Sequence, residues 1–344
     1  MAEPMTYAGS GVDIRAKDAA ARALLKAARF ARPPGPGAPI GPPGHYAGMV
    51  EFGEHALVLC TDGVGSKLEV ANAMRKWDTV GIDCVAMNVN DAVCVGAEPL
   101  AFVDYLAVER ADAALASELG KGLDEGCRQA NVSLVGGETA ILPGLVKGFD
   151  LAGTCLAVVR KDRILTGERV RPGDAVVGVA SSGIHSNGYT LACKALEAAG
   201  HAYTDKASGG RSLGDVLLEP TRIYVRAALE CLAAHDVHGI AHVTGSGLLN
   251  LPRLRRDVRW VLDDPLPIPA VFDLVREAGS IAEDEMHRTF NMGMGLAVVV
   301  PGDEAEAAAS LLARHFPAKV VGKIVEGKGI AVPSRSVELA GSKF

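Results

Sequence analysis

The stretch from Leu57 to Asp91 (LVLCTDGVGSKLEVANAMRKWDTVGIDCVAMNVND) constrains this chain more than any other. The apolar run from Leu57 to Cys60 predicts a buried strand that ends in the turn Asp62 to Lys67, DGVGSK. The acid of this turn offers oxygens to a hard cation, and its glycines and lysine suit an anion. Asp91 adds a second carboxylate about one helix later. Together they suit a magnesium-nucleoside triphosphate, because Mg²⁺ takes one or two carboxylates and completes its shell with water and phosphate oxygens.

The hexapeptide DGVGSK is not specific by itself. It matches neither G-x-x-x-x-G-K-[ST] nor G-x-G-x-x-G, and an Asp-Gly turn beside a lysine is usually only a solvated turn. Asp62 could therefore simply begin a turn, and Lys67 could be a solvated surface residue. Asp91 points more strongly to function, because a carboxylate in an otherwise apolar helix is costly to bury without a partner.

Composition excludes several classes of function. With 344 residues, 49% apolar and 22% charged, the chain is expected to form a soluble globular protein of two domains. The net charge of −6 and the absence of a basic block argue against nucleic acid and favour small-molecule partners. The seven cysteines never form C-x-x-C, which indicates buried thiols in a reducing compartment. Neither a signal peptide nor an apolar run of membrane-spanning length is evident, so we expect a cytoplasmic protein without a membrane partner.

Strands and helices alternate in both halves of the chain, which predicts mixed α/β layers. A charged segment ending in Arg171-Pro172-Gly173 divides the halves, so we predict domains at residues 1–170 and 171–344. The proline- and glycine-rich loop 32–48 fits either a surface connector or a lid over bound nucleotide. Strands are predicted at 57–60, 99–108, 132–135, 148–159, 175–180 and 294–300, and helices at 16–30, 83–96, 115–127 and 189–199.

Further strands also run into polar, glycine-containing turns. The strand 132–135 meets Gly136-Gly137-Glu138-Thr139, and the strand 175–180 meets residues 181–188, SSGIHSNG. In these turns Glu138 or Thr139 could serve a site or only cap a helix, and His185 could be a general acid or base or a satisfied core residue. His242 could line a cleft or simply end a strand.

Taken together, the motifs resemble one family. They occur in order and cover nearly the whole chain: TYAGSGVDI (6–14), CTDGVGSK (60–67), GIDCVAMNVND (81–91), GAEPLAFVDYLA (96–107), SLVGGETA (133–140), SSGIHSNGY (181–189), EPTRIYV (219–225) and RTFNMGMG (288–295). This set is similar to the aminoimidazole ribonucleotide synthetases, also called phosphoribosylformylglycinamidine cyclo-ligases, of purine biosynthesis.

The resemblance implies two α/β domains, of which the first pairs its sheet with that of a second subunit into a barrel. It also implies a homodimer that binds ATP between the domains, under the glycine-rich loop. The implied Mg²⁺ ligands are Asp13, Asp62 and Asp91. The implied nucleotide-binding residues are Asp62, Gly63, Gly65, Lys67, Asp91, Gly136, Gly137, Glu138 and Thr139. The implied substrate-binding residues are His185, Ser186, Asn187 and Gly188, and Lys67, Asp91 and His185 are the implied catalytic residues.

The sequence departs from the family pattern at a few positions. Pro42, Pro43 and His45 replace the usual residues of the glycine-rich loop, which puts the lid in doubt. Ile141 stands where an acid or amide is common, Ser246 stands for a glycine, and the glutamate that usually precedes Asn250 is absent. These changes bear on substrate contacts rather than on the metal and phosphate positions.

The implied reaction closes a five-membered ring after ATP phosphorylates a formyl oxygen. Relatives with the same ATP site are alternatives. A selenophosphate synthetase would need a cysteine before Cys60, and a carbamoyl dehydratase would need one near the C-terminus, beyond Cys231. A thiamine-phosphate kinase fits GGETA and HSNG poorly. A non-catalytic ATP-binding homologue stays open, although the acids at 62 and 91 argue against it.

Overall fold

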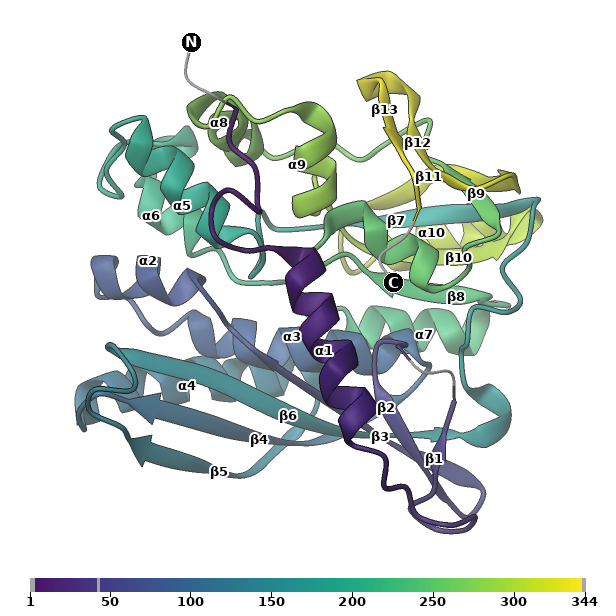
Figure 1. The fold of residues 1–344 in the computed structure, drawn as a ribbon. Helices are drawn as coiled ribbons and strands as arrows, with labels where there is room; N and C mark the ends of the chain where they lie inside the picture. Colours follow the sequence, from purple (N-terminus) through teal and green to yellow (C-terminus); the bar gives the residue numbers. More distant parts are fainter. Residues whose placement is uncertain (1–3, 42–43, 342–344) are drawn as a thin grey trace.

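The computed structural model describes residues 4–41 and 44–341, which form two α/β units, each built on one sheet (Figure 1). The first sheet lies in the lower part of Figure 1 and the second in the upper part, with helices between them. Mixed α/β layers were the expectation from the sequence, and the structure confirms them. Among the described residues, no helix is both long enough and apolar enough to cross a membrane.

The N-terminal sheet has the strand order β1-β2-β3-β6-β4-β5. Neighbouring strands are antiparallel except for β4 and β5, which are parallel. The strands are β1 (Pro39–Ile40), β2 (Gly48–Phe52), β3 (His55–Gly63), β4 (Glu98–Val108), β5 (Ser133–Ile141) and β6 (Phe149–Arg160). Helices α3 (Val80–Cys94) and α4 (Ala113–Ala130) cover one face of this sheet, and apolar side chains on the other face remain exposed.

Helices α3 and α4 pack closely because glycines line their crossing. A Cβ atom on Gly81 would clash with the backbone of α4 at Leu123, and one on Gly122 would clash with the carbonyl of Asp78. The stripe that predicted α4 from the sequence is confirmed, because Leu115, Leu119, Leu123 and Cys127 are all buried. Close packing of α4 holds α3 against the sheet.

The C-terminal sheet has the order β13-β12-β9-β11-β7-β10-β8, and six of the seven residues of its inner strand β7 are buried. Its strands are β7 (Asp174–Ala180), β8 (Gly239–His242), β9 (Val258–Val261), β10 (Met294–Pro301), β11 (Ala318–Glu326), β12 (Gly329–Val332) and β13 (Val337–Leu339). Its helices are α5 (Tyr189–Ala198), α6 (Leu213–Leu217), α7 (Val225–Ala234), α8 (Ala270–Ala278), α9 (Glu283–Thr289) and α10 (Ala305–Leu312), with the 3₁₀ segment η3 (Gly247–Arg253) after β8.

The N-terminal residues cross to the second unit. The amide of Met5 donates to the carbonyl of Gly279 at 3.1 Å, and Lys194 Nζ donates to the carbonyl of Ser10 at 2.7 Å. The helix α1 (Ile14–Ala27) that follows is exposed along nearly its whole length. The chain passes from the first sheet to the second between β6 and β7, and the predicted division at residue 170 stays a prediction.

One predicted turn is wrong. The residues Gly136 to Thr139 do not end the strand at 132–135, because β5 continues through them to Ile141, in register with β4. Gly137 is needed there for space, since a Cβ would clash with the carboxylate of Asp104. Both glycines therefore lie within a strand and not in a loop, and Gly137 lies close to Asp104 of the neighbouring strand.

The end of the proline- and glycine-rich loop is attached to the second unit. Tyr46 is buried and donates its hydroxyl to the carbonyl of Asn250 at 3.1 Å, and the Arg253 guanidinium stacks 3.9 Å from the centre of its ring. Pro42 and Pro43 lie outside the described residues. The choice between connector and lid stays open.

Candidate functional site

Two strand–turn–helix steps, one from each unit, meet at the interface. After β3, the turn at Gly65 leads into α2 (Lys67–Met74), and after β7 the loop ending at Gly188 leads into α5. Both glycines have positive φ, +72° and +82°, which other residues adopt only with strain. Ser66 Oγ lies 2.8 Å from Thr190 Oγ1, so the first turns of the two helices face each other. Converging helix N-termini favour an anion.

The acids predicted to bind a metal lie beside this junction. Asp62 is exposed near the end of β3, and Asp91 on α3 is 21% exposed. Crowding by neighbouring groups limits the solvation of the Asp62 carboxylate and raises its pKa, and the nearby charge of Asp91 raises it further. Two carboxylates that repel each other at a partly open position suit a cation between them.

His242 holds the second acid in place. It is fully buried at the end of β8, and its Nδ1–H donates to Asp91 Oδ1 at 2.8 Å. Its Nε2 faces Asn90 Nδ2 at 3.5 Å, which fits the tautomer protonated at Nδ1. From the sequence, His242 could line a cleft or simply end a strand. In the structure it ends β8 and also contacts Asp91 of the candidate site.

Two asparagines of α3 fix the surroundings of the acids. Asn88 Nδ2 donates to the carbonyl of Asp62 at 3.2 Å, which ties α3 to the end of β3. Asn90 donates to the carbonyl of Arg222 at 2.9 Å and accepts from the amide of Tyr224 at 2.8 Å, which ties α3 to the second unit. In the sequence, both residues belong to the motif GIDCVAMNVND, which gives no separate role for either of them. Buried amides in an apolar helix are the signal that could have singled them out.

His185 is buried in the loop before α5, with a left-handed backbone at φ +66°. The amide of Ser182 donates to His185 Nε2 at 3.1 Å, so the neutral ring carries its hydrogen on Nδ1. Burial lowers the pKa of His185 well below its usual value, and the positive charges of Lys67 and Arg222 act in the same direction. Its Nδ1 has no hydrogen-bond partner among the described residues. His185 is therefore a neutral imidazole with its hydrogen on Nδ1, and its role as a general acid or base stays a prediction.

The other predicted substrate-binding residues lie in the same loop. Ser186 is buried and its hydroxyl has no partner among the residues that the structure describes. Asn187 is half-buried and its Nδ2 lies 3.8 Å from the sulfur of Met87 on α3. Gly188 precedes the first turn of α5. The loop thus offers unused polar groups at the junction of the units.

Lys67 is not available for phosphate in this arrangement. Its side chain is fully buried, and its ammonium contacts both carboxylate oxygens of Asp83, at 2.8 and 3.0 Å, and the carbonyl of Glu219 at 2.7 Å. Two of these contacts are hydrogen bonds, to Asp83 Oδ1 and to the Glu219 carbonyl, and the third, to Asp83 Oδ2, is an ion pair. The prediction of a phosphate-binding Lys67 needs correction, because the sequence could not show that Asp83 would be its partner.

The β5 residues do not join the acids within one chain. Gly136, Gly137, Glu138 and Thr139 lie on the edge strand β5 and are exposed or half-buried, with β6 and β4 between them and β3. Three strand spacings correspond to about 14 Å. Their predicted place in the same cleft as Asp62 is wrong for a single subunit, because the sheet order separates them.

Asp13 lies at the start of α1. Its Oδ1 accepts from the amide of Ala16 at the start of α1, and it lines a recess between α1 and α9 with Ser246 and Arg288. Within the described part of the chain, no three side chains of His, Cys, Asp or Glu form a preformed metal cluster. The three-acid metal site of Asp13, Asp62 and Asp91 therefore stays a prediction, and one or two carboxylates are enough for Mg²⁺ bound together with phosphate.

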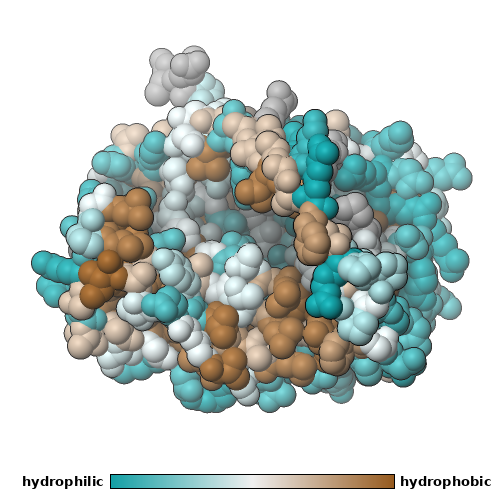
Figure 2. Space-filling view, turned by 60° about the horizontal axis from the view of Figure 1, so that its bottom comes forward, coloured by the Kyte–Doolittle hydropathy of each residue, from teal (hydrophilic) through white to brown (hydrophobic). Residues whose placement is uncertain are grey.

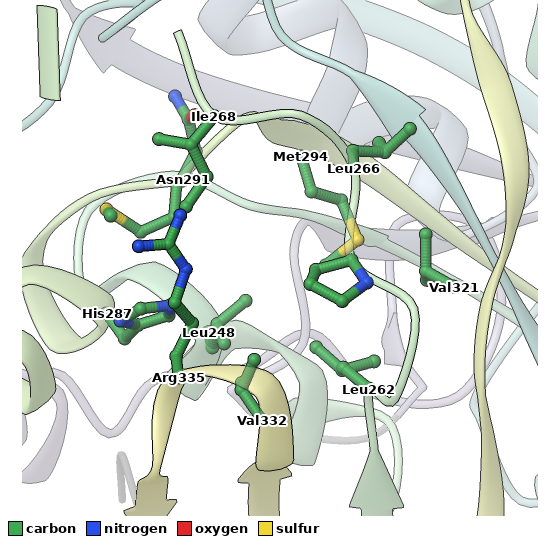
Figure 3. Close-up of a pocket in the computed structure, with 12 residues that line it drawn as sticks. Leu248, Leu262, Leu266, Ile268, His287, Asn291, Met294, Val321, Val332 and Arg335 are labelled. Atoms are coloured by element: carbon green, nitrogen blue, oxygen red, sulfur yellow. The ribbon is translucent and has the colours of Figure 1, made fainter. Parts of the chain in front are cut away.

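A separate apolar recess lies within the second unit (Figure 3). Met294, Leu266 and Val321 line one side of it, and His287 and Arg335 lie opposite. None of the residues predicted for the site lines it. The candidate site is therefore the junction of the two units and not this recess.

Solved structures share this two-unit fold. The protein tt0281 from Thermus thermophilus aligns with a TM-score of 0.66 and 24% identity over 94% of this chain and 99% of its own. The hydrogenase maturation protein HypE in complex with ATP aligns with 0.60 and 18% over 83% and 84%. AaThiL complexed with AMPPCP and TMP aligns with 0.61 and 15% over 94% of each chain. At these identities the similarity shows the fold alone.

Sequence comparisons are more specific. Family models for AIR synthase related protein match residues 44–159 with the N-terminal domain and residues 171–334 with the C-terminal domain. The phosphoribosylformylglycinamidine cyclo-ligase of Methanosarcina barkeri is 50% identical over 336 residues, which are 97% of this chain and 98% of that protein. The protein of the same name from Methanococcoides burtonii is 49% identical over 95% of this chain and 97% of its own length. The chain therefore belongs to the phosphoribosylformylglycinamidine cyclo-ligase family of AIR synthase related proteins.

Proposed function

We propose that this protein catalyses the ATP-dependent ring closure of formylglycinamidine ribonucleotide to 5-aminoimidazole ribonucleotide, with release of ADP and phosphate. Identity of about half over nearly the whole chain to cyclo-ligases supports this reaction. The structural observation that carries it is the pair Asp62 and Asp91 beside the facing first turns of α2 and α5. This junction offers a cation site next to an anion site, as a magnesium-nucleotide complex requires.

The chemistry explains why few reactive side chains are needed. Amide oxygen is a poor leaving group, so transfer of the γ-phosphoryl group of ATP to the formyl oxygen allows that oxygen to leave as phosphate when the amine nitrogen attacks. The protein then contributes mainly positioning and charge stabilisation. Asp62 and Asp91 would hold Mg²⁺, which when bound neutralises charge on the phosphoryl oxygens. His242 orients the carboxylate of Asp91 for this task.

His185 contributes as a hydrogen-bond donor in this proposal. A neutral imidazole with Nδ1–H at the junction can stabilise negative charge that develops on the phosphoryl or formyl oxygen. The hydroxyl of Ser186 and the first turn of α5 offer further donors beside it. This arrangement favours charge stabilisation by the loop rather than proton abstraction by its histidine.

We also propose a homodimer formed through the uncovered face of the N-terminal sheet. Leu59, Val103 and Tyr105 on this face are 38–48% exposed, and Val135 on the edge strand β5 is 64% exposed. Figure 2, which brings this part of the molecule forward, shows hydrophobic side chains gathered in patches. A second copy of the same face would cover them, and it would place the exposed Gly136–Thr139 edge within the interface.

A cytoplasmic location is part of the same proposal. All seven cysteines are free and buried, and burial raises the pKa of thiols such as Cys84 and Cys94 well above the usual value. Such thiols act as small apolar core residues, as expected in a reducing compartment.

The central experiment is a product assay. Purified protein with Mg²⁺ and ATP should release phosphate only when formylglycinamidine ribonucleotide is added, with aminoimidazole ribonucleotide formed in equal amount. Asp91→Asn should abolish both while the protein stays folded by circular dichroism, because one metal ligand is lost. Phosphate release without the ribonucleotide, or phosphorylation of thiamine phosphate, would replace this proposal with another activity, and no turnover with any substrate would favour a non-catalytic homologue.

The repulsion between the acids predicts a change in stability. A carboxyl group whose pKa is raised on folding destabilises the folded state once pH rises above its unfolded value of 3.8. At pH 7 and without Mg²⁺, Asp62→Asn should therefore raise the Tm by roughly 1–3 °C, a small effect because the group is partly solvated. The same variant should lose the stabilisation that Mg-ATP gives the wild type. A lower Tm for the metal-free variant would contradict mutual repulsion.

The role of His185 can be tested separately. The ring should stay neutral with hydrogen on Nδ1 from pH 6 to 8, as reported by ¹³C and ¹⁵N NMR shifts, because burial disfavours the charged form. Asn tolerates the left-handed backbone, so His185→Asn should fold and lower kcat by roughly 100-fold. The control His55→Gln, at the exposed opposite end of β3, should retain activity. A ring that becomes protonated near neutral pH would contradict the donor role.

The interface predicts a change in mass. The wild type should sediment at twice 35.7 kDa, and Tyr105→Glu should shift it to the monomer, because a charge would be buried in an apolar contact. Leu24→Glu on α1, which is 68% exposed but lies off the sheet face, should stay dimeric. A wild type that remains monomeric at high concentration would exclude this interface.

A further inference from the structure

A buried ion pair joins the two helices that follow β3. Lys67 at the start of α2 and Asp83 in the first turn of α3 are both fully buried, with Nζ 2.8 Å from Oδ2 and 3.0 Å from Oδ1. Burial lowers the pKa of Lys67 and raises that of Asp83. A charged pair without solvent is stable only where further hydrogen bonds complete it.

Those further bonds come from the second unit. The amide and hydroxyl of Thr221 donate to Asp83 Oδ1 at 2.8 and 2.6 Å, and the carbonyl of Glu219 accepts from Lys67 Nζ at 2.7 Å. The segment 219–221 therefore completes an ion pair whose charged members belong to the first unit. Separating the units would leave both charges without these partners.

The same segment continues to the loop of His185. Ser182 Oγ donates to the carbonyl of Pro220 at 2.5 Å, and the amide of Ser182 donates to His185 Nε2 at 3.1 Å. The second of these bonds places the hydrogen of the neutral ring on Nδ1. A continuous set of hydrogen bonds thus runs from Lys67 and Asp83 through residues 219–221 and Ser182 to His185.

We propose that the Lys67–Asp83 pair is a positioning device, which seats segment 219–221 against α3 and so sets the place and tautomer of His185 across the junction. Lys67 is then a positioning residue and not a phosphate ligand. The effect on turnover rests on the proposed function, whereas the effect on the His185 ring does not. Nothing in this role requires Lys67 to leave its three acceptors.

In the alternative hypothesis, the Lys67 side chain changes conformation and its ammonium contacts a phosphate group of the nucleotide. That movement would leave the carboxylate of Asp83 buried without its cation and the carbonyl of Glu219 without its donor, and both losses are unfavourable. The two hypotheses make different predictions for a variant in which both Lys67 and Asp83 are replaced by neutral residues. Such a variant has no unpaired buried charge, but it cannot make a contact between Lys67 and phosphate.

The test compares Lys67→Met with Lys67→Met/Asp83→Asn. The matched control is Lys76→Met, because Lys76 also joins α2 to the second unit, through Asp215 at 3.0 Å, but at the surface. Each protein is measured for thermal unfolding, for the Kd of a non-hydrolysable ATP analogue with Mg²⁺, for kcat, and for the ¹³C and ¹⁵N shifts of the His185 ring. Lys76→Met should match the wild type in all four.

The single variant should be strongly destabilised by the unpaired carboxylate, and the double variant should fold. We expect the double variant to bind the analogue within about threefold of the wild type, to show shifted His185 resonances and to lose kcat roughly 100-fold, the scale of a small misplacement. A folded double variant with unchanged His185 resonances, or with analogue affinity weakened about tenfold or more, overturns the inference. If the wild type itself does not bind the analogue, the proposed nucleotide site is wrong. The His185 resonances of the double variant then test by themselves whether the Lys67–Asp83 pair positions the ring.

Discussion

Helix α3 is buried between the two units, and the arrangement of the site depends on that burial. Thirteen of its fifteen residues are buried, and it packs on β3, β4 and β6 of the first sheet and on β8 and α7 of the second unit. Asn90 and Asp91 follow Asp83 by seven and eight positions, about two helical turns, so the three residues lie toward one side of the helix. All three make hydrogen bonds with the second unit. Burial without these partners would be unfavourable, and the partners therefore set the relative position of the units.

The two aspartates at the ends of α3, Asp83 and Asp91, have different charged neighbours. At its first turn, Asp83 has a cation, Lys67, and the local charge is neutralised within the protein. At its last turn, Asp91 interacts with another acid, Asp62, and its carboxylate accepts a hydrogen bond from the ring of His242. The charge of Asp83 is thus balanced within the protein, whereas the charges of Asp62 and Asp91 would be balanced by an added cation. The two aspartates of α3 therefore differ in their surroundings, although they look alike in sequence.

Much of the architecture followed from local patterns. The strand before DGVGSK, the stripe of α4 and the apolar run of β7 were each predicted from periodicity, and each is present. The site was predicted less completely. Asp62, Asp91 and the loop at His185 lie at the junction. Lys67 also lies there but is paired with Asp83, and the β5 residues lie three strands away from β3. An edge strand with two glycines looks like a turn in sequence, because nothing local shows that β4 lies beside it.

The sequence by itself determined which residues end strands, which turns need glycine, and to which family the motifs point. These properties depend on neighbours along the chain and on backbone conformation, so they can be recognised locally. Only the tertiary structure decided that Lys67 pairs with Asp83, that His242 contacts Asp91, and that His185 accepts at Nε2 and so carries its hydrogen on Nδ1. Strand order and the packing of the two units bring the latter groups together from far apart in sequence, and burial then fixes their charges and tautomers.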